Sequence, residues 1–169
     1  YTTLFRSEAI DEILVETYLV GYKQCGLADG SINPKTPTDA KFSTPYTVAT
    51  ALLKGNVTLE DFKEENIATE DVQRLLRKVR VVPNEVFTER YPKHWGCKTT
   101  IRMLDGRSYE VEIKDALGSV YNPLSKEDIK RKVSPLLEVS YKEKVSKLIE
   151  DLLRIDQVSD LSKLFSNWM

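Results

Sequence analysis

The sequence contains few of the residues that bind metals or form disulfide bonds. Its 169 residues include two cysteines, Cys25 and Cys97, and one histidine, His94. Two cysteines are too few for the disulfide framework of a small secreted protein, and one histidine leaves almost no ligand set for zinc. We therefore expect neither a zinc enzyme, an iron–sulfur protein nor a disulfide-rich secreted domain, and we predict no metal and no cofactor.

Long apolar runs and an excess of charge of one sign are also missing. The apolar runs are short, so we expect no segment that spans a bilayer and no apolar leader. There are 25 Lys and Arg against 26 Asp and Glu, which gives a net charge of −1. Such a surface has no strong field to attract nucleic acid or an anionic membrane. We expect a soluble, cytoplasmic protein with neither of these partners.

The glycine-rich motifs of nucleotide-binding loops and the Gly-x-Ser-x-Gly turn of serine hydrolases are absent. These motifs place backbone N–H groups or a nucleophile where the chemistry needs them. The sequence therefore lends no support to a nucleotide-binding enzyme or a serine hydrolase.

The composition that remains is globular, with 41% apolar and 30% charged residues. A chain of this length fits one domain, or one domain and a piece of another. Segment 12–21 is rich in β-branched and aromatic residues and predicts a strand, whereas 26–38 predicts a loop. Ser43 is expected to cap a helix that Gly55 ends.

Further helices and a strand follow. Thr58 and Thr69 are expected to begin two helices, the second with apolar residues at helical spacing, and 79–82 to form a strand closed by Pro83. Near the C-terminus, Ser125 with Asp128 resembles a capping box, and Pro135 should end or kink that helix. Apolar residues at helical spacing predict another helix across 141–152, and the chain ends in apolar positions.

The clearest strand signal is a hairpin around Asp105-Gly106. Apolar residues alternate before and after this turn. A two-residue loop would mix the faces of the sheet, whereas a three-residue loop, 104–106, pairs Ile101 with Tyr109. We predict the second register, and an α+β fold: an antiparallel sheet of about four strands with helices packed on one face, plus C-terminal helices.

Two clusters could carry chemistry, and each has a simpler interpretation. His94 near Cys97 suggests a base and a nucleophile, but Cys97 falls on the apolar face of the hairpin, which favours a structural role. Four basic residues between 74 and 80 could contact nucleic acid, but no aromatic residues interleave with them, which favours a solvated helix face.

Tyr46 is the most informative single position. It lies in the first turn of the helix capped by Ser43, where free N–H groups and the helix dipole favour an anion, with Lys41 nearby. A phenol there could donate a proton to a developing anion, although spacing alone favours a packing role at the start of the helix. We predict Tyr46 as catalytic, with Lys41 and Ser43 as substrate-binding residues.

Segment 38–55, with its Lys-Phe-Ser-Thr-Pro-Tyr run, resembles part of the MmgE/PrpD family. Segment 57–62, the hairpin loop 104–107 and the Asn-Pro-Leu-Ser-Lys-Glu-Asp run at 122–128 resemble further family segments in the same order. The family includes 2-methylcitrate dehydratases, which act in propionate catabolism, and cis-aconitate decarboxylases.

The resemblance implies the smaller, α+β domain of a larger homodimeric lyase that handles a tricarboxylate without a metal. It maps the family's tyrosine onto Tyr46, and it implies that a helical domain absent from this chain supplies most of the acid–base residues. On this basis we divide the chain into residues 1–9, of uncertain origin, the family domain at 10–137 and C-terminal helices at 138–169. We expect a 2-methylcitrate dehydratase-like hydro-lyase fragment that is inactive alone.

Two other functions stay open. The chain could be a non-catalytic interaction or dimerisation module that uses its last helices, since a domain separated from its neighbour exposes apolar surface. It could also bind a small molecule without chemistry.

Overall fold

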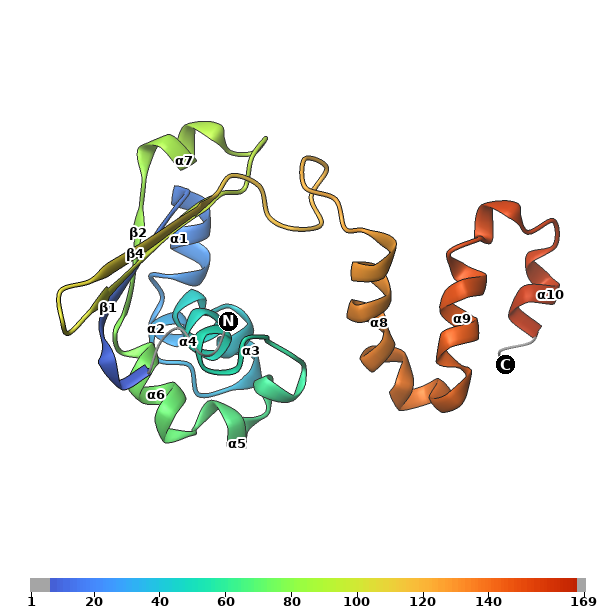
Figure 1. Ribbon diagram of the computed structural model, residues 1–169, viewed down its shortest axis with the longest axis horizontal. Coiled ribbons are helices and arrows are strands. Elements are labelled where there is room, and N and C mark those ends of the chain that lie inside the picture. Colours follow the sequence, from blue (N-terminus) through green and yellow to red (C-terminus); the bar gives the residue numbers. More distant parts are fainter. Residues whose placement is uncertain (1–6, 167–169) are drawn as a thin grey trace. The chain divides into compact units, whose positions relative to one another are not determined.

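The computed structural model describes residues 7–166 (Figure 1), so the predicted extension at 1–9 lies mostly outside the described residues; Ser7–Ala9 forms a short 3-10 turn, η1. The chain divides into two compact units, Tyr1–Ala116 and Leu117–Met169. The first contains the sheet and the second is built from helices. The predicted α+β class is confirmed.

Four strands form one sheet in the order β2-β1-β3-β4. They are β1 (Ile10–Thr17), β2 (Val79–Pro83), β3 (Cys97–Met103) and β4 (Ser108–Ile113). The pairs β1–β3 and β3–β4 are antiparallel, but β1–β2 is parallel, so the sheet is mixed and not purely antiparallel. The helical connection after β1 returns the chain to the end of the sheet at which β1 begins, so β2 runs parallel to β1.

The hairpin of β3 and β4 has the predicted register. Ile101 lies opposite Tyr109, and Lys98 lies opposite Glu112. Gly106 has a φ of 86°, the left-handed conformation that a three-residue loop of this kind needs. The register of the hairpin is therefore determined by local sequence: the alternation of apolar and polar residues on both strands, and Gly106 in the loop.

The first strand is shorter than predicted, because β1 ends at Thr17 and helix α1 (Leu19–Cys25) begins at once. The Leu19 N–H donates to Thr88 Oγ1, and the Tyr18 ring stacks on Tyr91 with centroids 4.8 Å apart. Both contacts come from residues far along the chain, so the β-favouring composition of 18–21 was overridden by tertiary structure.

The segment predicted as a loop contains two short helices, α2 (Asp29–Ile32) and α3 (Pro37–Lys41). Thr36 and Asp39 form a capping box at α3, with Pro37 at the start of the helix. The sequence contains this capping pattern, but it was interpreted as a loop. Thr, Pro and Asp are common in turns, and the same residue types also begin helices.

Helix α4 (Thr44–Lys54) is capped by Ser43 and followed by Gly55 at a φ of 75°, as predicted. After it come η2 (Glu60–Phe62), α5 (Glu64–Ile67), α6 (Glu70–Leu76) and, beyond β2, α7 (Glu85–Arg90). Thr69 precedes α6 but makes no side-chain cap; its hydroxyl donates to the Asn66 carbonyl instead.

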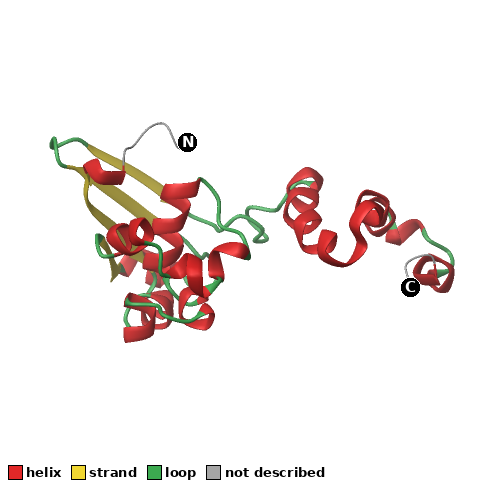
Figure 2. Ribbon diagram, turned by 90° about the horizontal axis from the view of Figure 1, so that it is seen from below, coloured by secondary structure: helices red, strands yellow, loops and turns green. Residues whose placement is uncertain are grey.

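Helices α1 to α6 gather on one face of the sheet, as Figures 1 and 2 show. The main core joins the two layers, and a second, smaller core lies among the helices. The main core is formed by Ile10, Ile13, Val15, Ala49, Leu75, Leu76, Val81, Ile101 and Met103. The predicted packing of helices on one face is confirmed.

The second unit contains α8 (Lys126–Tyr141), η3 (Lys142–Lys144), α9 (Val145–Leu152), η4 (Ile155–Gln157) and α10 (Leu161–Ser166). The Ser125–Asp128 capping box is present. Of the two outcomes expected at Pro135, an end or a kink, the first is wrong because α8 continues through this proline; a kink stays a prediction. The boundary drawn between residues 137 and 138 falls inside α8, whereas the compact units meet at Ala116 and Leu117.

The predicted helix across 141–152 is interrupted. Lys142 adopts a φ of 46°, which separates α8 from α9. Among the helices at residues 7–166, none is both long enough and apolar enough to cross a membrane.

Candidate functional site

The start of α4 is organised by Ser43, which is 1% exposed. Its hydroxyl accepts the Tyr46 N–H at 3.0 Å and donates to the Ser31 carbonyl at 2.5 Å. Both bonds lie inside the protein; the first caps α4 and the second joins its start to α2. The structure therefore places Ser43 as a buried helix cap, away from solvent. Lys41, at the end of α3, is exposed and is separated from this cap by Phe42.

Tyr46 is completely buried. Its hydroxyl donates to the Asp61 carbonyl, and its ring packs against Phe62 at 5.9 Å between centroids. Burial raises the pKa of the Tyr46 phenol, so the group is a protonated donor at neutral pH. The helix start therefore does not present this phenol to solvent, because the second core closes over it, which agrees with the packing role that spacing alone favoured. The catalytic role of Tyr46 itself stays a prediction.

Asp61 is the most constrained ionisable group near Tyr46, with 5% of its side chain exposed. One carboxylate oxygen lies 2.5 Å from Lys54 Nζ. The other accepts the Thr58 N–H at 2.7 Å and the Thr58 hydroxyl at 2.8 Å. Burial by itself raises the pKa of Asp61, but the bonds from Lys54 and Thr58 outweigh it and hold the pKa below its ordinary value. The carboxylate is therefore a fixed, charged anchor.

Four residues thus form one connected set of contacts, which we call the Tyr46–Asp61 network: Tyr46, Lys54, Thr58 and Asp61. It ties both ends of α4 to η2. Tyr46 was predicted from the sequence, but Asp61 was given no role, because the spacing of the acidic residues did not require a shared site. The available signal was Thr58 three residues before Asp61, a capping-box spacing.

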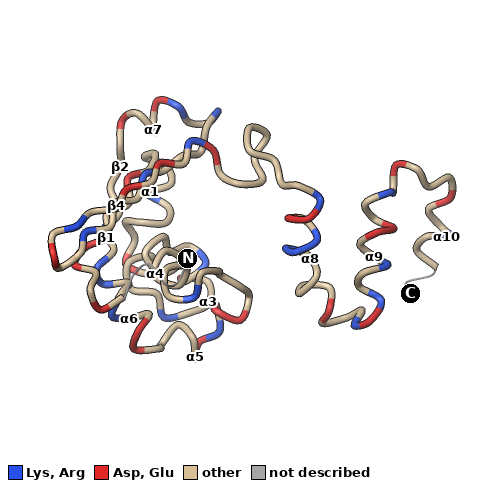
Figure 3. Tube along the Cα trace, viewed as in Figure 1, with Lys and Arg blue, Asp and Glu red and all other residues tan. Residues whose placement is uncertain are grey.

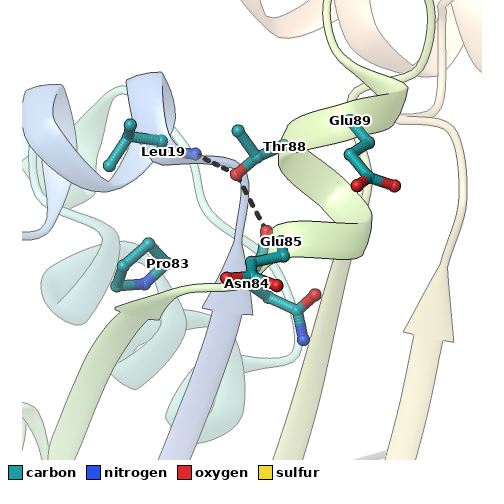
Figure 4. Close-up of a pocket in the computed structure, with 6 residues that line it drawn as sticks. All are labelled: Leu19, Pro83, Asn84, Glu85, Thr88 and Glu89. Atoms are coloured by element: carbon teal, nitrogen blue, oxygen red, sulfur yellow. Dashed lines mark hydrogen bonds between the residues drawn. The ribbon is translucent and has the colours of Figure 1, made fainter.

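A cavity of about 400 Å³ lies where the parallel strands β1 and β2 end (Figure 4). Leu19 and Pro83 form an apolar wall, and Glu85 and Glu89 add carboxylates from α7. The Thr88 hydroxyl is occupied: it accepts the Leu19 N–H at 2.9 Å and donates to the Asn84 carbonyl at 2.8 Å. Two carboxylates repel an anion, so this cavity does not suit a tricarboxylate. It contains none of the predicted site residues.

His94 and Cys97 do not form a base and a nucleophile. His94 Nδ1 lies 2.8 Å from Asp115 Oδ1, a contact that joins the two ends of the hairpin. Burial raises the pKa of the Cys97 thiol, which leaves it protonated and weakly nucleophilic at neutral pH. These observations favour the structural interpretation.

Three of the four basic residues between 74 and 80 are engaged by neighbouring groups. Arg74 pairs with Asp71 at 2.7 Å, Arg80 pairs with Glu12 at 3.2 Å, and Lys78 donates to the Ile10 carbonyl. These contacts are those of an ion-paired surface. Within the described range 7–166, no group of three His, Cys, Asp or Glu residues is arranged to hold a metal ion.

Comparison with known proteins shows which family and which relative the chain resembles. The family model described as the MmgE/PrpD C-terminal domain matches residues 3–155. Among curated proteins, the chain is similar to a cis-aconitate decarboxylase of Mus musculus, with 25% identity over 99 residues. That alignment covers 59% of this chain and 20% of the mouse protein. The chain therefore spans about a fifth of the length of this relative.

Proposed function

Because this chain belongs to the MmgE/PrpD family, we propose that it is the C-terminal domain of a cytoplasmic lyase that acts on a tricarboxylate. The observation that carries the proposal is the family match across nearly the whole chain. The mouse relative, whose name is cis-aconitate decarboxylase, supports a substrate of this class. The chain spans about a fifth of that relative, so we propose that a further domain supplies the remaining catalytic groups.

Within this class we propose hydration or dehydration of 2-methylcitrate as the reaction, with decarboxylation of cis-aconitate as the alternative. Both substrates carry three carboxylates, so both need cationic or N–H donor groups around them. The Glu85–Glu89 cavity cannot supply such groups. We therefore place the substrate on the side of α4, with Lys41 as the nearest predicted cation.

We propose Tyr46 as the proton donor of this site. Its raised pKa keeps the phenol protonated, which general acid catalysis requires. In the described arrangement the phenol is committed to the Asp61 carbonyl. Donation to a substrate therefore requires the α4–η2 contact to open, with the phenol exchanging one acceptor for another. Until another domain completes the site, the chain alone should be inactive.

The proposal is tested by incubating the chain with 2-methylcitrate and, separately, with cis-aconitate, and by following the products by NMR. We expect no turnover by the chain alone. We expect turnover when the chain is part of the complete lyase, with a loss of at least about a hundredfold for Tyr46→Phe. Robust turnover by the isolated chain contradicts the proposal that another domain is needed. An unchanged rate for the Tyr46→Phe lyase contradicts the proposal that Tyr46 is the proton donor.

A second candidate, a dimerisation module, is favoured by one observation in the second unit. Helix α8 buries none of its residues, and a groove of about 420 Å³ runs between α8 and α9. Its lining is apolar: Ile129, Val133, Leu136, Leu137, Ile149, Leu152 and Leu153. Sedimentation at several concentrations separates the candidates. Dimers that Val133→Glu abolishes support the module, and a clean monomer rejects it.

A further inference from the structure

Strand β4 is an open edge of the sheet. In the order β2-β1-β3-β4, none of the described strands pairs with its outer side. Its sequence, Ser-Tyr-Glu-Val-Glu-Ile, holds no proline, glycine or lysine, and its pairing with β3 runs without a register shift. Proteins commonly block free edges with such residues or with bulges. This edge has only two glutamates, Glu110 and Glu112, as charged groups.

The backbone of β4 leaves three residues facing that edge. The Met103 N–H donates to the Arg107 carbonyl at 2.8 Å, which makes these two residues a hydrogen-bonded pair. Hydrogen-bonded and non-bonded pairs alternate along an antiparallel ladder. Ile101 and Tyr109 are therefore bonded to each other, while Ser108, Glu110 and Glu112 direct their N–H and C=O groups outward.

The apolar face of the sheet extends one strand farther than its helical cover. On β3, Ile101 is 8% exposed, whereas Val111 and Ile113 on the same face of β4 are 54% and 44% exposed. Helices α1 to α6 lie over the other strands (Figures 1 and 2). A polypeptide laid beside β4 would bury this remaining apolar strip.

The opposite face carries charges whose sign alternates from strand to strand, as the ion pairs show. Figure 3 marks where the charged residues lie along the chain. Arg80 on β2 pairs with Glu12 on β1, and Glu12 pairs with Arg102 on β3. Lys98 on β3 lies 3.9 Å from Glu16 on β1 and 2.8 Å from Glu110 on β4. The order is positive, negative, positive, negative. Glu112 also pairs with Arg90 of α7 at 3.1 Å. A strand added beyond β4 would meet two carboxylates, each with one cationic partner within the chain, and should carry positive residues to complete the alternation.

We propose that the β4 edge binds, as a fifth strand, an extended polypeptide segment in which Lys or Arg alternates with apolar residues. The basic residues would face Glu110 and Glu112, and the apolar ones would cover Val111 and Ile113. A second copy of β4 is disfavoured, because the two antiparallel registers with the longest overlap bring Glu110 opposite Glu110 or Glu112 of the other copy. Like charges at opposed positions are destabilising.

The probe is an acetylated, amidated peptide, Lys-Val-Lys-Val-Lys-Val, and its matched control is Glu-Val-Glu-Val-Glu-Val. Both are titrated into the full chain while amide exchange is followed by NMR. We expect the lysine peptide to slow exchange at Ser108, Glu110 and Glu112, and the glutamate peptide to have no effect. Equal protection by both peptides, or none by the lysine peptide, overturns the proposal.

Variants of the edge sharpen the test. Glu110→Lys together with Glu112→Lys should weaken binding of the lysine peptide about tenfold and favour the glutamate peptide. Glu110→Pro removes an outward N–H together with the carboxylate that pairs with Lys98, but no β3–β4 backbone hydrogen bond, so it should abolish protection of Ser108 and Glu112 while the β3–β4 ladder stays protected.

The control Glu127→Lys with Glu138→Lys changes the net charge equally but lies on α8. It should leave peptide binding unchanged. An equal loss in this control overturns the proposal, because binding would then reflect net charge. Protection of the same amides by increasing protein concentration without peptide also overturns it, because a second copy would then be the occupant.

Discussion

At the scale of single residues, the Tyr46–Asp61 network determines how α4 is held. Asp61 is bound through two different groups. Its backbone carbonyl accepts the Tyr46 hydroxyl, and its side-chain carboxylate is bound by Lys54 and Thr58. Because both groups are buried, removing either partner leaves a polar atom without its bond, which costs more than the bond itself contributes. Two substitutions separate these contributions.

Tyr46→Phe removes the phenol and leaves the Asp61 carbonyl without a donor from that side chain. We expect a loss of about 1–2 kcal/mol in the free energy of unfolding, measured by urea denaturation. The matched control is Tyr109→Phe, whose phenol is bonded to the exposed Arg107 guanidinium and should change stability by less than about 0.5 kcal/mol. Equal effects of the two substitutions would show that the buried bond contributes nothing.

Asp61→Asn tests the carboxylate by its pH dependence. The folded-state pKa of Asp61 lies below its ordinary value, so its contribution to stability is present above about pH 4 and is lost as the pH falls through the folded pKa. We expect Asp61→Asn to cost about 2 kcal/mol at pH 7. The difference from the unchanged chain should shrink progressively below about pH 4.

Urea denaturation across this pH range measures both quantities. Asp11→Asn, which alters an exposed carboxyl on β1, is the control and should show neither effect. A difference for Asp61→Asn that stays constant from pH 7 to pH 3 would contradict the assignment of Asp61 as a charged anchor.

At the scale of elements, the break between α8 and α9 is the most strained connection. Lys142 adopts a φ of 46° and a ψ of −123°, a combination that residues with a Cβ rarely adopt. The apolar spacing across 141–152 would suit one continuous helix, so the break opposes local preference. After the break, Val145, Leu148 and Ile149 on α9 are buried.

Lys142→Gly should relieve this strain. We expect the helical unit to gain about 1 kcal/mol, measured as a higher midpoint of thermal unfolding by circular dichroism. The control is Lys144→Gly, since Lys144 has helical dihedrals (φ −80°, ψ −9°) and should lose stability by up to about 1 kcal/mol. A loss on Lys142→Gly comparable to that of the control would show that the break carries no strain.

At the scale of the whole molecule, the two compact units have separate cores. The unit Tyr1–Ala116 is built around the sheet, and the unit Leu117–Met169 around Val145, Leu148, Ile149 and Leu164. A small unit buries a smaller fraction of its surface and is correspondingly less stable. The second unit should therefore unfold first.

Leu148→Ala tests this independence. Leu148 is 6% exposed, and its truncation should cost about 2–5 kcal/mol within the helical unit. Amide exchange by NMR should accelerate throughout α9 and stay unchanged at Ile13 and Ile101 in the sheet. Val139→Ala, at an 82% exposed position, should change neither. Faster exchange in the sheet on Leu148→Ala would show that the units unfold together.

Part of this protein was determined by the sequence on its own. The Ser43 cap, the Ser125–Asp128 capping box and the hairpin register were predicted because each depends on residues close together in the chain. The family segments were readable for the same reason. The α3 capping box was equally local, and its omission was a matter of weighing turn residues as loop residues.

Only the tertiary structure decided the rest. The parallel pairing of β1 with β2, the end of β1 at Thr17 and the burial of Tyr46 depend on residues 15 to 69 positions apart. A helix start exposes N–H groups whatever its surroundings, but whether a side chain there meets solvent or a second core depends on how distant segments pack. The capping pattern at Ser43 and the family resemblance therefore located the functional candidate, and the packing of η2 against α4 determined its environment.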